Sequence, residues 1–170
     1  MLILFLLNTP TALAKLRREI DDGIAEGTIS SPIRDAEARQ MPYLQAAIKE
    51  GIRFYPPQTA LNSKEVPAGG AEVNGFRLPG GTQVAVNILA ITRSQGLFGP
   101  DADVFRPERW IEAETVDPER YKEMCASVEL VFGFGKYQCL GKVIAAVELN
   151  KVPVEVCHDS PISPPTRSAA

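Results

Sequence analysis

The segment Phe-Gly-Phe-Gly-Lys-Tyr-Gln-Cys-Leu-Gly, residues 132–141, constrains this chain more than any other stretch. Gly133 and Gly135 permit positive φ angles and let the backbone approach a bulky group closely, which a Cβ atom would hinder. Phe132 and Phe134 add apolar aromatic surface, which suits a flat organic group better than a phosphate. The segment therefore predicts a loop that lies against a flat ligand.

The cysteine of this segment, Cys139, is placed to ligate a metal. Residues 142–151 have a helical pattern, so Cys139 is expected at or near a helix N-terminus. Helix N-termini favour the thiolate over the thiol, and a thiolate is the form that ligates haem iron. The alternative is an ordinary buried cysteine near a helix start, because free cysteine is among the most buried residue types.

Two common glycine-rich motifs are excluded by spacing. A phosphate-binding loop needs four residues between its glycines and then Gly-Lys-Ser/Thr, whereas five residues separate Gly135 from Gly141, and Val143 follows Lys142. A dinucleotide-binding fingerprint does not fit either, because no x-x-Gly follows the first two glycines of the segment.

Composition limits the remaining function classes. The three cysteines are irregularly spaced, which argues against a disulfide scaffold or a Cys-x-x-Cys zinc site. The one histidine, His158, excludes a metal centre built on several histidines. A formal charge of −3 gives no reason to expect nucleic acid as a partner. A redox thiol protein is a further alternative, and Cys125 is its candidate resolving cysteine.

Hydrophobic periodicity predicts a mainly α fold with a small β-sheet, of the α+β class. A helix is expected after Thr9 and Pro10, with an apolar stripe at Leu13, Leu16, Ile20 and Ile24. A second helix is expected from Pro42 to Phe54. Residues 64–91 predict short strands, with a turn at Asn74-Gly75 and a strand from Thr82 to Ile88. The apolar run from Met1 to Leu7 is too short to span a bilayer and lacks the positive start of a signal peptide.

The spacing Phe-x-x-Gly-x-x-x-Cys-x-Gly resembles the haem-binding signature of the cytochrome P450 family, with Cys139 at the position of the proximal thiolate. Two more motifs agree in order. Residues 50–53 look like the family's Glu-x-x-Arg, and residues 105–110 look like its Pro-x-Arg-Phe/Trp motif. The surrounding sequence is similar to fungal, pisatin demethylase-like members. The resemblance covers about residues 1–152 and only the C-terminal portion of the family chain, so an incomplete cytochrome P450 fold is expected.

The resemblance implies roles for specific residues. Haem b would be bound through Cys139, with cofactor contacts from Phe132, Gly133, Gly135, Tyr137 and Gly141. A buried structural network would join Glu50, Arg53 and Arg109 and hold the cysteine loop in place. Substrate contacts would come from Gln58, Thr59, Ala60 and Leu61. The family usually has arginine or histidine two residues before the cysteine, facing a haem propionate; this chain has Tyr137 there, and the adjacent Lys136 is the candidate to compensate.

The implied activity is that of a haem-thiolate monooxygenase, which inserts one oxygen atom from O2 into an apolar organic substrate. Electrons would come from an NADPH-dependent flavoprotein reductase docked on Lys136, Lys142 and Lys151, although these lysines also fit an ordinary solvated face. Full-length relatives would reside in the endoplasmic reticulum membrane; this chain shows no anchor, which predicts a cytoplasmic location. The family's acid-threonine pair for proton delivery is not found. The alternative is a truncated, catalytically inactive fragment with at most weak haem binding.

The end of the chain departs from the family pattern. Pro153 is expected to end or kink the helix that follows Cys139. Residues 153–170 are rich in proline and serine and predict a divergent, disordered tail. This departure indicates a truncated or altered gene product.

Overall fold

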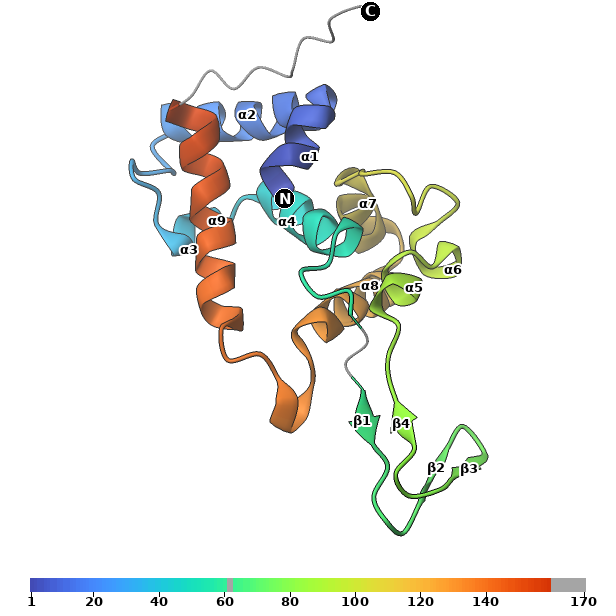
Figure 1. The fold of residues 1–170 in the computed structure, drawn as a ribbon. Helices are drawn as coiled ribbons and strands as arrows, with labels where there is room; N and C mark the ends of the chain where they lie inside the picture. The colour runs from blue at the N-terminus through green and yellow to red at the C-terminus, as the bar shows by residue number, and fades with distance from the viewer. Residues whose placement is uncertain (61–62, 160–170) are drawn as a thin grey trace, which may run out of the picture.

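The computed structural model describes residues 1–60 and 63–159. Helices predominate within these ranges, and the few strands are short, which confirms the predicted α+β class. None of the helices described is long and apolar enough to cross a membrane. In chain order the helices are α1 (Leu2–Asn8), α2 (Pro10–Ala25), α3 (Asp35–Ala38), α4 (Pro42–Phe54), α5 (Ile88–Thr92), α6 (Gln95–Phe98), α7 (Glu108–Val116), α8 (Pro118–Glu129) and α9 (Lys142–Asp159) (Figure 1).

The strands form two separate two-stranded antiparallel sheets rather than the single small sheet expected. β1 (Lys64–Glu65) pairs with β4 (Gln83–Val84), and β2 (Ala71–Val73) pairs with β3 (Phe76–Leu78). The turn between β2 and β3 falls at Asn74 and Gly75, which have φ angles of 51° and 80°. Figure 1 shows the sheets on an arm that extends away from the helices. The strand expected from Thr82 to Ile88 is much shorter, because Asn87 caps α5 by accepting a hydrogen bond from the N–H of Ala90.

Helix α4 is the centre of the helical body because apolar residues on two of its faces enter different cores. Leu44, Ala47 and Ile48 pack with the buried stripe of α2, whereas Ala46 faces α6, α7 and α8. The α2 stripe is buried at Leu13, Leu16 and Ile20, as predicted, but Ile24 near the helix end is exposed. Thr9 occupies the N-cap position of α2, although its side chain makes no capping hydrogen bond.

A carboxylate from α2 fixes the start of α4. Glu19 accepts hydrogen bonds from the backbone N–H groups of Tyr43 and Leu44, at 2.7 and 2.9 Å, and so satisfies donors that a helix N-terminus leaves unpaired. Burial raises the pKa of the Glu19 carboxyl, and these two hydrogen bonds oppose that rise. The hydroxyl of Tyr43 donates to Glu108 of α7 at 2.9 Å, and Lys15 of α2 pairs with the same carboxylate at 2.6 Å. Three helices therefore meet at the start of α4.

Helix α9 continues through Pro153 to Asp159, so of the two outcomes expected at Pro153, an end or a kink, the end is wrong. Tertiary contacts explain the continuation. Val154 and Cys157 are buried in the core that α2 and α4 share, and Glu155 accepts a hydrogen bond from the N–H of Ile33 at 2.6 Å. These contacts offset the backbone hydrogen bond that proline cannot donate inside a helix. Residues 160–170 of the predicted disordered tail lie outside the described residues.

Candidate functional site

The loop between α8 and α9 presents Cys139 to solvent. Two short 3-10 turns, Leu130–Phe132 and Gly135–Tyr137, precede the cysteine. The N–H of Cys139 donates to the carbonyl oxygen of Phe132 at 2.7 Å and closes the loop on itself. Cys139 lies just before α9, whose first residue, Lys142, donates its N–H to the Cys139 carbonyl at 3.3 Å. The cysteine therefore lies next to the N-terminus of α9.

Gly133 makes the closed loop sterically possible. Its φ angle is +75°, in the region that residues with a Cβ rarely adopt, and a Cβ there would lie 2.7 Å from the backbone oxygen of Tyr137. Gly135 also has a positive φ, +60°, but a Cβ there would meet no atom within 4 Å. Of these two glycines, Gly133 is therefore the one that the loop packs against.

Apolar side chains surround the cysteine and are exposed with it. Cys139 is exposed, which excludes the alternative of an ordinary buried cysteine. The exposed fractions are 84% for Phe134 and 99% for Leu140, and Val143 and Ile144 at the start of α9 are exposed as well. Large apolar groups grouped around a potential metal ligand indicate a binding surface, because single-chain proteins rarely leave such patches uncovered.

An apolar cavity of about 450 Å³ lies between α1, α4 and α9. Phe132 lines it from the cysteine loop, Gly51 and Ile52 line it from α4, and Leu149 and Val152 line it from α9. Within the described ranges, the structure has no group of three or more His, Cys, Asp or Glu side chains that could hold a bare metal ion. One exposed cysteine, a loop that needs glycine and apolar surroundings fit a flat prosthetic group that takes a single axial ligand from the protein.

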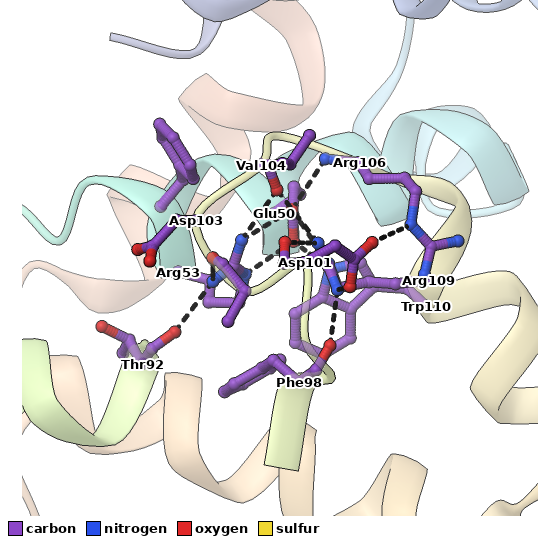
Figure 2. A network of polar contacts seen from close by, with 12 residues as sticks. Glu50, Arg53, Thr92, Phe98, Asp101, Asp103, Val104, Arg106, Arg109 and Trp110 are labelled. Carbon is purple, nitrogen blue, oxygen red and sulfur yellow. Dashed lines mark hydrogen bonds and ion pairs between the residues drawn. The ribbon is translucent and has the colours of Figure 1, made fainter. Parts of the chain in front are cut away.

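Helix α4 also carries a buried polar network (Figure 2). The Glu50 carboxylate accepts two hydrogen bonds from Arg53, both at 2.8 Å, and one from the Nε of Arg109 at 3.1 Å. Arg53 also donates to the carbonyl oxygens of Thr92 and Ala102, at 2.9 and 2.7 Å. Glu50 and Arg53 have no exposed side-chain surface. The structure thus brings together the three residues that the motifs singled out.

Sequence reasoning missed other members of this network. Trp110 donates its indole N–H to Glu50 at 2.9 Å, and the backbone N–H of Arg106 donates to Glu50 at 2.8 Å. Asp101 accepts from Arg109 at 2.9 Å and from Arg106 at 2.6 Å. Burial would raise the pKa of Asp101, but the hydrogen bonds and charges of these two guanidinium groups together lower it. Trp110 belongs to the Pro-x-Arg-Trp motif, and that motif was the available signal.

The predicted propionate side of the loop also has a partner that the sequence did not reveal. Lys64 of β1 lies over the ring of Tyr137, with its Nζ 3.4 Å from the ring centroid. Lys136, the sequence candidate to compensate at this position, is farther from the ring, at 5.7 Å. Lys142, a member of the predicted docking patch, pairs with Glu129 at the end of α8.

The predicted substrate residues follow α4. Gln58, Thr59 and Ala60 are exposed and do not line the cavity described above. Leu61 lies outside the described residues. The three cysteines are free thiols, with Cys125 half-buried on α8 and Cys157 buried on α9.

Comparison with known proteins decides the family. The family model for Cytochrome P450 matches residues 1–156. The chain belongs to the cytochrome P450 family. This P450 chain is 44% identical over 155 residues to the protein named Cytochrome P450 monooxygenase ABA1 of Pyricularia oryzae, a match that covers 91% of the chain and 30% of that relative.

Two further fungal relatives agree. Cytochrome P450 monooxygenase aba1 of Botryotinia fuckeliana is 44% identical over 154 residues, covering 91% of this chain and 30% of the relative. Cytochrome P450 monooxygenase cicH of Emericella nidulans is 43% identical over 147 residues, covering 86% of this chain and 29% of the relative. The P450 chain therefore spans about 30% of the length of these relatives. The resemblance to fungal P450 proteins is confirmed.

Proposed function

We propose that this chain provides the haem-binding part of a haem-thiolate monooxygenase and that Cys139 is the axial ligand of the iron. The observation that carries the proposal is the exposed cysteine on a closed loop that requires Gly133, in a chain of the P450 family. The proposed group is haem b. When bound, it supplies reductive activation of O2 and transfer of one oxygen atom to an apolar substrate, with electrons from an NADPH-dependent flavoprotein reductase.

The residues of the chain would hold the group in distinct ways. Cys139 would supply the thiolate, and the turn at Gly133 would keep the loop closed beside it. Phe134 and Leu140, both exposed next to the cysteine, would exclude water from the axial ligand. Tyr137, with Lys64 over its ring, would bind a propionate, because a lysine ammonium supplies the cation that the tyrosine lacks. Phe132 and Gly141 would complete the contacts around the ligand.

The polar network would act as scaffold. Glu50 and Arg53 belong to α4, which lines the apolar cavity through Gly51 and Ile52. Arg109 joins the same carboxylate from α7, so an ion pair joins α4 to α7. We infer that this network fixes α4, the helix that lines the cavity opposite Phe132 of the cysteine loop.

A specific observation favours the second candidate, an inactive chain with weak haem binding. Leu140 is 99% exposed, so in the described chain no protein surface covers that side of the cysteine. A half-open site loses the burial from which most ligand affinity comes. Turnover by this chain alone is therefore not part of the proposal.

A haem titration tests the proposal. Wild type, Cys139→Ser and Cys125→Ser are titrated with hemin, then reduced under carbon monoxide. Thiolate ligation predicts a strongly red-shifted Soret band in wild type and in Cys125→Ser and its loss in Cys139→Ser. The Cys125 variant is the matched control because that cysteine lies on α8, outside the loop. An unshifted band in all three proteins would contradict the proposal.

A further inference from the structure

The loop that carries Cys139 has little core packing of its own. Residues 134–140 are all exposed, and Val131 is the buried side chain at its start. Backbone hydrogen bonds hold the inner part of the loop, from Cys139 to the Phe132 carbonyl and from Gly133 to the Leu130 carbonyl. Exposed backbone of this kind opens easily unless other contacts restrain its ends.

Lys142 makes contacts that close the loop from outside. Its ammonium group pairs with the carboxylate of Glu129, so the last residue of α8 is joined to the first residue of α9. The same ammonium lies 5.9 Å from the centroid of the Phe132 ring, within cation–π range. Three contacts therefore close the loop, each one farther out than the last. They are the hydrogen bond from Cys139 to Phe132, the cation–π contact of Lys142 with Phe132, and the ion pair of Lys142 with Glu129.

Charge and exposure indicate what such a pair can do. The side chains of Lys142 and Glu129 are 30% and 59% exposed, so the pair contributes little to global stability. The position of the pair is the informative feature, because it joins the two ends of the cysteine loop, which has little contact with the core. Constraining the ends of a flexible loop lowers the entropy cost of ordering it when a ligand binds.

We propose that the Glu129–Lys142 pair is a clasp that positions Cys139 for ligation, with Lys142 as a positioning residue and not as a free member of a docking patch. The proposal rests on the proposed function, because it takes Cys139 to be the axial ligand. It further assigns Lys142 an intramolecular role, which leaves Lys136 and Lys151 as the lysines of the patch available to a reductase.

Hydrogen exchange of residues 130–141 in the chain without haem tests the clasp independently of Cys139 chemistry. Glu129→Gln breaks the pair and keeps the lysine charge, whereas Lys142→Met breaks the pair and removes that charge. Both should speed exchange about two- to fivefold, the range expected for one exposed ion pair. The exchanged-charge variant, Glu129→Lys with Lys142→Glu, should restore protection, and raised salt should weaken it in wild type.

Lys136→Met is the matched control, because Lys136 lies in the same loop and forms no ion pair within the described residues. Lys136 does make a cation–π contact in the loop, at 5.7 Å from the Tyr137 ring centroid, so its loss should speed exchange less than the loss of the ion pair in either clasp variant. Equal acceleration in Lys136→Met, or unchanged exchange in both single clasp variants, would overturn the proposal.

A second measurement separates positioning from loop stability. After hemin binding and reduction under carbon monoxide, the fraction of red-shifted Soret band reports how much of the haem is thiolate-bound. Glu129→Gln and Lys142→Met should both lower this fraction, and the exchanged-charge variant should recover it. If the clasp variants speed hydrogen exchange but leave the thiolate-bound fraction unchanged, the pair only restrains the loop locally, and its role in positioning Cys139 is overturned. Absence of a red-shifted band in wild type would instead contradict the proposed function and leave the exchange result intact.

Discussion

At Glu50, one buried carboxylate faces the guanidinium groups of Arg53 and Arg109 and the indole N–H of Trp110. Buried ion pairs add little net stability when complete, because desolvation offsets attraction. Breaking one is different, since the remaining charges stay buried without compensation. The network therefore matters mainly through what happens when a member is lost.

We predict that Glu50→Gln lowers the free energy of unfolding by about 3–5 kcal/mol, because two buried arginines lose their shared counter-charge. Urea unfolding followed by circular dichroism measures the change. Glu119→Gln is the control: Glu119 and Lys122 have the same i, i+3 spacing, but their side chains are 84% and 70% exposed. That substitution should change stability by less than about 0.5 kcal/mol. Similar losses in both variants would contradict the buried role.

The residues of this site differ in how far sequence could predict them. Cys139, Glu50, Arg53 and Arg109 lie in motifs whose spacing is visible along the chain. Lys64 over Tyr137 was not predictable, because strand β1 is brought to the loop by tertiary folding and no local period marks that contact. Asp101 was missed for the same reason, since its partners approach through an irregular segment.

At the scale of the element, the cysteine loop depends on one glycine more than on the other. Gly133→Ala should lower the free energy of unfolding by about 2–4 kcal/mol, from a strained φ and a Cβ forced against the Tyr137 backbone oxygen. Gly135→Ala carries the φ strain without the clash and should cost about 1–2 kcal/mol. Urea unfolding and hemin titration measure both effects. Equal costs would show that the close approach at Gly133 is not required.

The short helix α3 gives a pH-dependent prediction. Glu37 accepts hydrogen bonds from the Ser30 side chain, the Ser30 N–H and the Arg34 N–H, which lower the pKa of its carboxyl from 4.5 to about 2. A depressed folded-state pKa stabilises the fold above the unfolded value, and this contribution is lost as the pH falls from about 4.5 towards 2.

The Glu37→Gln variant should therefore be less stable than wild type at pH 5, and the difference in their free energies of unfolding should shrink as the pH falls through that window. Urea midpoints at pH 5, 4 and 3 measure the gap. Ser30→Ala, which removes the strongest of the three donors, should give an intermediate result. A gap that is constant across these pH values would contradict the assignment.

Helix α9 shows why the expected helix stop at Pro153 was wrong. By local rules, a proline inside a helix predicts that the helix breaks. Here the buried side chains beyond Pro153 and the hydrogen bond from Ile33 to Glu155 outweigh that local cost. Helix α4, by contrast, was predicted with its correct bounds, because its apolar stripe and its terminal prolines agree with its tertiary environment.

The cost of Pro153 can be measured. Pro153→Ala should raise the free energy of unfolding by about 1–2 kcal/mol, because alanine restores a helical N–H while losing the packing of the proline ring. Pro118→Ala is the control, since Pro118 is the first residue of α8, where proline is tolerated, and stability should change by less than about 0.5 kcal/mol. Thermal unfolding distinguishes them. A loss of stability in Pro153→Ala would show that the ring packing dominates.

At the scale of the whole molecule, α4 contributes to both apolar clusters, and α9 is hydrogen-bonded to α3 and α4. Asn150 of α9 donates to Asp35 at 2.7 Å and accepts from Gln45 of α4 at 2.9 Å. The helix after the cysteine loop and the helix that bears Glu50 are thus held in one frame. Its mainly α character was predictable from periodicity, whereas the division of the strands into two sheets was not, because pairing partners are chosen by tertiary placement.

The unequal exposure of the three cysteines has a practical consequence. Cys157 is buried, Cys125 is half-buried and Cys139 is exposed, so a thiol-specific alkylating reagent should modify Cys139 first. If Cys139 ligates haem iron as proposed, its sulfur would be alkylated more slowly when the cofactor is bound. The rate of alkylation at Cys139, followed by mass spectrometry, would therefore report how much of the proposed site is occupied, with no need for an absorption measurement.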